Sequence, residues 1–505
     1  MLDRPTKLQD YQTYIDGKWV DAISGKKFQT FDPYTGEPWA LIPECGKEDA
    51  DRAVEAAYRA FDSGPWPQMT PTARGKVMRR IAGLIETHAD HLGQVEVRDN
   101  GKLISEMGAQ TKYMPEWFYY YGGLADKIQG AVVPVDRPDH FNYILKEPVG
   151  VCAFITPWNS PLMLTTWKLA PALAAGCTVV IKPSEFTSAS LLEFMKLVIE
   201  ESGLPPGVVN VVTGYGAVVG EPLVTHPKVA KVAFTGGTAT GARVNELAAN
   251  TFKKVSLELG GKSPNIVFDD CNLDDAVSGA VSGIFAATGQ TCIAGSRLLL
   301  QETIHDAFVE KLIAMAKTAK LGDPGLPETQ VGPVTTPPQY QKILGYIDIA
   351  KGEGAKCVLG GGPATKEEGG GKYFVQPTIF TGVDNKMRIA QEEVFGPVLS
   401  VIKFKDEDDA VRIANDIAYG LGAGVWTQSV RRAHTMARKI KAGTVWVNTY
   451  RAVSFLMPFG GYKASGLGRE NGAEAIEGYL QTKSVWINNG PGGGNPFVMK
   501  TASSS

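Results

Sequence analysis

The sequence predicts an α/β protein built on parallel sheets. Between positions 149 and 260, short apolar segments rich in β-forming residues alternate with helical segments at ~25–30-residue spacing, which is typical of βαβ units. A second alternation of the same kind begins at position 265. The chain has 505 residues, and at ~100–200 residues per domain this length predicts about three domains.

Five apolar segments of the first region are predicted strands. Their apolar residues stand at successive positions, which indicates burial on both faces of the sheet. Glycine, proline or serine stands near the predicted helix ends. The predicted order is strand Val149–Ile155, helix Leu162–Ala175, strand Thr178–Ile181, a helix capped by Ser188 and ended by Gly203, strand Val208–Val212, strand Lys231–Phe234, helix 241–250 and strand Val255–Leu259.

The second region continues the alternation toward the C-terminus. An apolar strand at Phe141–Leu145 lies outside both regions. The elements predicted for the second region are strand Asn265–Phe268, helix Leu273–Ala287, strand Arg297–Leu300, helix Ile304–Ala319 and strands Val398–Phe404, Val425–Thr427 and Thr444–Asn448.

The composition excludes a disordered or fibrous chain. Hydrophobic residues make up 44% and charged residues 21%, both near the globular average. The 51 Lys and Arg residues against 53 Asp and Glu give a net charge of −2, so the basic excess of nucleic-acid-binding proteins is absent. We expect no nucleic-acid partner, although the total charge does not test for a local basic patch.

The six cysteines predict free thiols, because they are widely spaced and form neither a C-x-x-C pair nor a zinc-binding cluster with histidine. The first residues have no apolar core of a secretory signal, and no apolar run reaches the ~18 residues of a membrane span. We expect a cytoplasmic protein with no metal site and no membrane partner. The cysteines are Cys45, Cys152, Cys177, Cys271, Cys292 and Cys357.

Ligands of parallel α/β sheets bind at the carboxyl ends of the strands. Most of the chemically interesting polar residues of the first region lie at such ends. The predicted strand ends are Thr156–Asn159, Lys182–Glu185, Thr213–Gly216, Thr235–Gly237 and Glu258–Gly261.

Two residues are candidates for covalent and acid–base chemistry. Cys292 lies in the segment GQTCIAG (289–295), whose glycines allow close approach of a ligand, so its thiol is a candidate nucleophile. A buried structural cysteine is the alternative. Glu258 ends a strand beside two glycines and is a candidate general base. A solvated or ion-paired glutamate is the alternative.

Three further strand ends are candidates for binding. The Asn159 amide can donate to an oxyanion, or the residue can be a simple turn former. Lys182 and Glu185 can hold a ribose, and a carboxylate there disfavours a 2′-phosphate; a surface ion pair is the alternative. The segment GGTATG (236–241) opens a helix whose N–H groups attract phosphate, but it departs from G-x-G-x-x-G.

Seven short motifs follow one another along the chain. They are WN (158–159), KPSE (182–185), FTGG (234–237), ELGGKSP (258–264), GQTC (289–292), EEVFGP (392–397) and PFGG (458–461). Each motif is weakly specific alone, whereas their common order and spacing is highly specific. In this order and spacing the chain resembles the aldehyde dehydrogenase superfamily from about residue 12 to 485.

The resemblance implies catalytic roles for three of these residues. Cys292 matches the family's nucleophile, Glu258 its general base and Asn159 its oxyanion donor. The implied reaction converts an aldehyde to a carboxylic acid through a thiohemiacetal and a thioester. The implied cofactor is NAD, with NADP possible but weaker.

The resemblance also implies a set of cofactor contacts. Lys182 and Glu185 match the adenine-ribose contacts, and Glu393 matches the nicotinamide-ribose contact beside Phe395. Gly237 stands where many members carry serine, so one hydroxyl contact to the pyrophosphate is missing. The full expected set is Thr156, Trp158, Lys182, Ser184, Glu185, Gly236, Gly237, Gly241, Leu259, Glu393 and Phe395.

The positions that match the family's substrate funnel are mostly apolar or aromatic, which suits a medium or bulky aldehyde. Arg451 lies in a loop that lines the funnel entrance in relatives, where it binds a substrate carboxylate or is a plain surface charge. The funnel positions are Met114, Trp167, Thr291, Arg451, Val453 and Phe459.

The family organisation implies a cofactor-binding domain from residues 1–128 and 149–260, and a catalytic domain over 261–465. Residues 129–148 and 478–490 would form a small β oligomerisation element, so the implied partner is a second copy of the chain in a homodimer or homotetramer. Pairing with another subunit explains the isolated apolar strand. The alternatives are a coenzyme-A-acylating semialdehyde dehydrogenase, which characteristically lacks the Glu258 base, and a non-catalytic structural protein.

Overall fold

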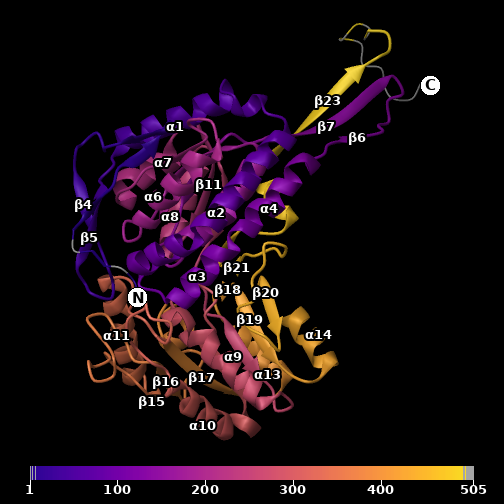
Figure 1. The fold of residues 1–505 in the computed structure, drawn as a ribbon. Coiled ribbons are helices and arrows are strands. Elements are labelled where there is room, and N and C mark those ends of the chain that lie inside the picture. Colours follow the sequence, from indigo (N-terminus) through magenta and orange to yellow (C-terminus); the bar gives the residue numbers. More distant parts are fainter. Residues whose placement is uncertain (1, 3, 6, 493–494, 496, 498–505) are drawn as a thin grey trace.

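The computed structural model describes residues 2, 4–5, 7–492, 495 and 497. It contains two α/β lobes and a narrow β arm that projects from the first lobe (Figure 1). The predicted α/β class is confirmed, and both main sheets are predominantly parallel.

The first lobe is built on a six-stranded sheet. Its first five strands run parallel, and their chain order reverses direction between β8 and β11. Such a reversal opens a crevice at the carboxyl ends of the two strands, where α/β proteins bind ligands. In spatial order the strands are β10 (Val209–Val211), β9 (Thr178–Lys182), β8 (Val151–Ile155), β11 (Val229–Thr235), β12 (Lys254–Glu258) and β22 (Gly466–Leu467).

Helices cover both faces of this sheet and bury two apolar cores against it. The predicted helix beginning near Ser188 is the least regular. Its hydroxyl donates to Ser184 O at 2.8 Å and does not cap the helix, which passes into a π turn and a 3₁₀ turn before Gly203. The helices of this lobe are α1 (Lys47–Asp62), α2 (Pro71–Asn100), α3 (Ile104–Tyr113), α4 (Pro115–Leu124), α5 (Pro161–Ala175), α6 (Ala189–Phe194), α7 (Glu221–Thr225) and α8 (Thr238–Ala249).

The second lobe is built on a seven-stranded sheet with one antiparallel edge strand, β15. Its helices are α9 (Leu273–Phe285), α10 (His305–Ala316), α11 (Pro337–Gly352), α12 (Arg388–Gln391), α13 (Glu407–Asn415) and α14 (Val430–Lys439). In spatial order its strands are β15 (Lys356–Leu359), β16 (Thr378–Thr381), β17 (Val398–Phe404), β14 (Arg297–Gln301), β13 (Pro264–Val267), β19 (Gly422–Trp426) and β20 (Thr444–Val447).

The chain returns from the second lobe to the first near its C-terminus. Strand β22 pairs antiparallel with β12, so that Gly466 lies beside Glu258. The following 3₁₀ segment η8 (Ala473–Tyr479) packs on α5. This return brings residues 466–479 to the edge of the first sheet, far from where chain order alone would place them.

The projecting arm is a three-stranded antiparallel sheet. Strand β7 pairs with β23 along its whole length, from Leu480 opposite Pro148 to Asn488 opposite His140. Exposed apolar side chains, including Phe141 and Trp486, stand on this arm. Its strands are β6 (Ala131–Val132), β7 (His140–Pro148) and β23 (Leu480–Asn488).

Three smaller sheets complete the described fold. Two lie in the N-terminal part of the chain, and the third pairs β18 with β21. Within the part of the chain that the structure describes, no helix is long and apolar enough to cross a membrane. The short strands are β1 (Gln9–Asp10), β2 (Thr13–Ile15), β3 (Lys18–Val20), β4 (Lys27–Phe31), β5 (Pro38–Pro43), β18 (Tyr419–Gly420) and β21 (Tyr462–Lys463).

Candidate active site

The register of the first sheet brings its functional strand ends to one edge. Ile155 lies opposite both Lys182 and Phe234, and Thr235 lies opposite Glu258. The polar segments that follow β8, β9, β11 and β12 therefore meet along a single crevice, as the parallel arrangement predicts. Two adjoining cavities lie along it.

The larger cavity has a volume of about 460 Å³ and ends at the N-terminus of α8. A β-carbon added at Gly237 would meet no atom within 4 Å, so the space before these N–H groups is open, as an anionic ligand requires. At Gly241 a β-carbon would lie 2.3 Å from the Leu259 side chain, so glycine lets α8 approach β12 closely. The predicted cofactor residues that line this cavity are Thr156, Trp158, Lys182, Ser184, Glu185, Gly236 and Gly237.

Lys182 and Glu185 form the polar end of this cavity. The Lys182 ammonium donates to Pro183 O at 2.8 Å and lies 3.4 Å from a Glu185 carboxylate oxygen. Lys182 is almost completely buried, and burial lowers its pKa despite the nearby Glu185 charge. The Glu185 carboxylate is partly exposed toward the cavity, which suits hydrogen bonding to a hydroxyl pair.

The smaller cavity, of about 150 Å³, contains all three predicted catalytic residues. It shares the walls Trp158, Gly236 and Gly237 with the larger cavity, so the two form neighbouring compartments of one crevice. Its predicted lining residues are Trp158, Asn159, Gly236, Gly237, Glu258, Leu259, Cys292, Glu393 and Phe395.

Cys292 is presented by a bent segment between α9 and β14. The predicted extension of the helix to Ala287 is wrong, because Ala287 and Thr288 adopt left-handed φ values of 54° and 53°, each at a cost on the order of 1–2 kcal/mol. The Tyr450 hydroxyl donates to Ile293 O at 3.0 Å on the other side of Cys292. The left-handed residues on one side of Cys292 and the Tyr450 contact on the other therefore define the path of the segment that carries the thiol.

The Asn159 side chain is aimed at this same segment. Its amide nitrogen Nδ2 donates to Gln290 O at 3.0 Å, and Asn159 is buried. One of the two amide hydrogens is thus engaged, while the other is available to a ligand atom near Cys292.

Burial and negative charge control the protonation of the two reactive groups. Burial, with the charges of Glu258 and Glu393, raises the pKa of the Cys292 thiol to about 12. Burial, with the charge of Glu470, raises the pKa of Glu258 well above its usual range. Both Glu258 oxygens are buried, and neither has a hydrogen-bond partner among the residues that the structure describes. A water molecule or ligand in the cavity is the natural partner for this carboxyl group.

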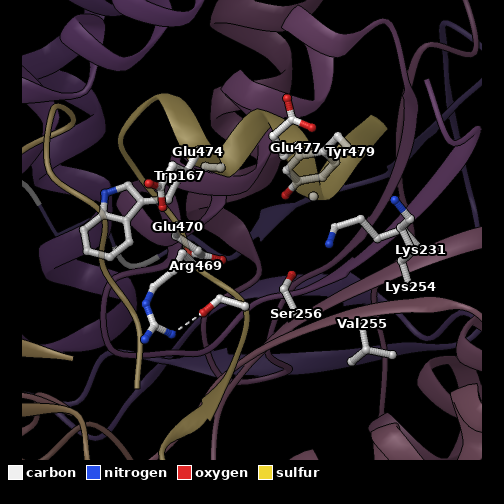
Figure 2. Close-up of a pocket in the computed structure, with 13 residues that line it drawn as sticks. Trp167, Lys231, Lys254, Val255, Ser256, Arg469, Glu470, Glu474, Glu477 and Tyr479 are labelled. Carbon is white, nitrogen blue, oxygen red and sulfur yellow. Dashed lines mark hydrogen bonds between the residues drawn. The ribbon is translucent and has the colours of Figure 1, made fainter. Parts of the chain in front are cut away.

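A buried ion pair lies behind Glu258. The Lys168 ammonium binds a Glu470 carboxylate oxygen and donates to Thr235 Oγ1 at 2.7 Å. Lys168 lowers the pKa of Glu258, which opposes the effect of Glu470. Figure 2 shows Glu470 and Trp167 on the wall of a separate cavity of about 600 Å³, whose opposite side carries Lys231.

Glu393, the residue expected to contact the nicotinamide ribose, is positioned by a hydrogen bond from a backbone N–H group. A Glu393 oxygen accepts from Gly261 N at 2.9 Å, while burial raises the pKa of Glu393. Phe395 packs edge-on against Trp158 with ring centroids 5.3 Å apart. These residues contribute one carboxylate and two aromatic rings to the lining of the smaller cavity.

The predicted funnel residues lie largely within one apolar cluster. Met114, Trp167 and Phe459 belong to this core, and Val453 and Cys292 pack against it. The Trp167 and Phe459 rings are 5.1 Å apart.

The two remaining funnel residues are polar. The Arg451 guanidinium donates a hydrogen bond to Ser282 O at 3.2 Å, and the Arg451 backbone has a left-handed φ of 65°. The Thr291 hydroxyl is buried without a partner, directly before Cys292 in the chain.

Several residues that complete the site were not predicted. Trp117 stacks on Trp167 at 6.1 Å, and Phe455 contacts Trp117 at 5.7 Å, so the aromatic surface is larger than expected. The buried ion pair of Lys168 and Glu470 was also missed. The excess of aromatic residues at 113–120 is a sequence signal that would have pointed to this surface.

The site combines a partly buried thiol and a buried carboxyl group with an adjoining larger cavity that ends at the N-terminus of α8. The family model "Aldehyde dehydrogenase family" matches residues 19–485. The chain therefore belongs to the aldehyde dehydrogenase family. No cluster of three or more His, Cys, Asp or Glu side chains suited to a metal occurs among the residues that the structure describes.

Similar proteins include a (Z)-2-((N-methylformamido)methylene)-5-hydroxybutyrolactone dehydrogenase of Acinetobacter baylyi. It is 47% identical over 98% of this chain and 100% of its own length. A crystal structure of betaine aldehyde dehydrogenase from Staphylococcus aureus with NAD+ is 43% identical, with a TM-score of 0.94 over 97% of each chain. An NAD+ complex of an aldehyde dehydrogenase from Bacillus cereus is 44% identical, with a TM-score of 0.92 over 95% of this chain and 97% of that one.

The raised pKa of Cys292 predicts the pH dependence of its alkylation. Because only the thiolate reacts, and its fraction increases with pH until the pKa of about 12 is passed, alkylation of the free enzyme by iodoacetamide should increase throughout the range from about pH 7 to about pH 10. Quenched samples analysed by peptide mass spectrometry measure this rate. A plateau near the ordinary thiol pKa of ~8.5 would contradict the burial described here.

Proposed function

We propose that this chain oxidises an aldehyde to a carboxylic acid with reduction of NAD+, using Cys292 as nucleophile, Glu258 as general base and Asn159 as oxyanion donor. The observation that carries the proposal is the presence of these three side chains on one small cavity beside a dinucleotide-sized crevice. The NAD+-bound relatives support the choice of cofactor.

The first half of the proposed reaction forms a bond to sulfur. The Cys292 thiolate attacks the aldehyde carbon, and the carbonyl oxygen becomes an alkoxide. The free hydrogen of Asn159 Nδ2 donates to this alkoxide, and so does the Cys292 backbone N–H, as the family resemblance implies. Since the thiol pKa is about 12 in the free protein, a proton must leave Cys292 for solvent before or during attack. The carbon of the resulting thiohemiacetal then loses a hydride, for which bound NAD+ would be the acceptor, and its alkoxide re-forms the carbonyl group. The product of this half is a thioester on Cys292.

The residues that line the larger cavity fit a dinucleotide. The α8 N-terminus faces open space at Gly237 for a pyrophosphate, and Glu185 and Glu393 supply carboxylates for two riboses. NAD+, when bound, supplies the hydride acceptor. The protein's part is to hold Cys292 and the aldehyde carbon beside Phe395 and Trp158, which exclude water from this side.

The second half releases the acid by hydrolysis. Glu258 takes a proton from water, and the resulting hydroxide attacks the thioester carbon, so that sulfur leaves as the thiolate. Only the ionised form of Glu258 acts as a base. Because the pKa of Glu258 is raised, this ionised form accumulates at higher pH than it does for an ordinary glutamate. Lys168 favours the ionised form, whereas burial and Glu470 oppose it.

Replacing Glu258 should separate the two halves of the reaction. We expect Glu258→Gln to keep a burst of NADH close to one per active site, because Cys292 and Asn159 remain, while steady-state turnover falls at least ~100-fold with loss of the base. Stopped-flow absorbance at the NADH band measures both phases. Cys292→Ala is the matched control and should abolish the burst while NAD+ still binds. Unimpaired turnover of the Gln variant would mean that Glu258 is not the base.

The exposed carboxylate of Glu185 predicts a preference for NAD+. We expect a higher kcat/KM for NAD+ than for NADP+, because a 2′-phosphate would be repelled by Glu185, and we expect Glu185→Ser to narrow the ratio at least ~10-fold. Steady-state kinetics with both cofactors measures this. Equal kcat/KM values in the unmodified protein would contradict the assignment.

The aromatic surface around Trp167 favours a medium or bulky aldehyde as the substrate. Trp117, Phe455 and Phe459 extend this surface, and the lactone dehydrogenase relative acts on a bulky compound according to its name. The Arg451 guanidinium donates from Nη1 to Ser282 O, and its Nε and Nη2 would be the donors to a substrate carboxylate. An unchanged KM for carboxylated semialdehydes in Arg451→Ala would remove that role.

A coenzyme-A-acylating activity is the main alternative. Glu258 favours hydrolysis, because the acylating branch characteristically lacks this base. NADH formation with and without coenzyme A separates the two activities, and the hydrolytic reaction should need none. A structural protein without activity predicts no NADH with any aldehyde.

We also propose that the protein acts as a cytoplasmic homodimer or homotetramer assembled through the β arm. The paired strands β7 and β23 carry exposed apolar residues, including Phe141, Leu145, Trp486 and Ile487, and a second subunit would cover them.

A further inference from the structure

Three consecutive residues before Cys292 adopt left-handed backbone conformations. Ala287, Thr288 and Gly289 have φ values of 54°, 53° and 68°. Only glycine adopts this region without strain, so two of the three residues need outside contacts to remain there. The segment is short, and any relaxation in it would move the thiol that follows three residues later.

A side chain from another helix contacts the start of this segment. The Glu106 carboxylate, in the first turn of α3, accepts a hydrogen bond from Ala287 N at 2.6 Å. The residues are 181 positions apart, so the contact exists only in the folded chain. The other Glu106 oxygen is buried and has no hydrogen-bond partner within the described part of the chain.

Lys102 balances the charge of Glu106 in this interior. Lys102 is 2% exposed, and its ammonium donates to Ser160 Oγ at 3.2 Å. Burial lowers the pKa of Lys102 to about 8, whereas the charges of Glu106 and Cys292 raise it. The ammonium is therefore close enough to both groups to interact electrostatically with the carboxylate and with a thiolate.

Other contacts hold the segment farther along. Thr288 Oγ1 donates to Gly332 O at 3.2 Å, and Gln290 Oε1 accepts from Thr335 N at 2.9 Å. Among these contacts, the bond from Ala287 N to Glu106 is the shortest, and it acts on the first left-handed residue.

We propose that Glu106 is a positioning residue for the Cys292 nucleophile, because its hydrogen bond to Ala287 N holds the left-handed segment in the conformation that keeps the thiol in the catalytic cavity. The inference rests on the proposed role of Cys292. The length of the Glu106 side chain matters because it brings a carboxylate oxygen within hydrogen-bond distance of Ala287 N. Lys102 has the secondary role of compensating the negative charge of Glu106.

Two conservative variants separate reach from charge. Glu106→Gln keeps an oxygen at the same distance from the backbone and loses the charge, while Glu106→Asp keeps the charge and withdraws the acceptor by one methylene group. We expect the NADH burst rate of the Gln variant to stay within about threefold of the unmodified protein and that of the Asp variant to fall at least ~10-fold, as expected when a nucleophile is misplaced. KM for NAD+ should stay within about twofold in both, since Glu106 does not line the cofactor cavity.

Glu116→Ala is the matched control. Glu116 is an exposed carboxylate in the first turn of the neighbouring helix α4, so its loss changes a helix N-terminus in the same way without touching the Cys292 segment. It should leave both the burst rate and KM unchanged. Melting temperatures of all variants confirm that rates are compared on folded protein.

Alkylation of Cys292 by iodoacetamide tests the same inference without an aldehyde. Release of the segment would move the thiol away from Glu258, Glu393 and the buried cavity that raise its pKa, so the alkylation profile of the Asp variant should shift to lower pH by at least about one unit. The profile of the Gln variant should match that of the unmodified protein. This readout remains valid if the unmodified protein forms no NADH with any aldehyde, a result that would reject the proposed function alone.

Two results would overturn the inference. One is an Asp variant whose burst rate and alkylation profile equal those of the unmodified protein. The other is a Gln variant impaired as strongly as the Asp variant, which would mean that an acceptor of the right reach is not sufficient and that the charge of Glu106 is required as well.

Discussion

The partial removal of one thiol and the nearly complete removal of one carboxyl group from water are together the constraint on which this site depends. Cys292 and Glu258 share a cavity of about 150 Å³, and burial is the largest cause of the raised pKa of each. The charge of Glu258 also disfavours the Cys292 thiolate, and the charge of Glu470 disfavours ionised Glu258. Cys292 and Glu258 therefore both favour their protonated forms in this cavity. A reaction that uses Cys292 as nucleophile and Glu258 as base must remove the proton of each group before that group acts.

Two sheets and one returning segment produce this cavity. The carboxyl edge of the first sheet supplies Asn159 and Glu258, the second lobe supplies Cys292 and Glu393, and strand β22 closes the edge beside Glu258. The buried pair Lys168–Glu470 joins α5 to this returning segment. Because the catalytic side chains come from both lobes, the relative position of the lobes determines whether the thiol and the carboxyl group act together.

The parts of the site that follow strands could be predicted from sequence, whereas those that depend on distant packing could not. Lys182 and Glu258 are the last residues of strands and Asn159 follows shortly after one, so parallel topology alone places them at one edge. Cys292 needed the motif order, because nothing local distinguishes a nucleophile from a buried thiol.

The missed residues illustrate the opposite case. Glu106 lies 181 positions from its partner, and Lys168 lies 302 positions from Glu470, so no local pattern connects them. The prediction that the helix extends through Ala287 was wrong, because helix propensity does not report the tertiary contacts that stabilise a left-handed turn.

The central claim, that Cys292 bonds covalently to the substrate, is tested most directly by mass spectrometry of the enzyme after acid quenching during turnover. The account predicts an acyl group on the peptide that contains Cys292, with a mass set by the aldehyde used. The absence of any such adduct, or its appearance on another cysteine, would contradict it.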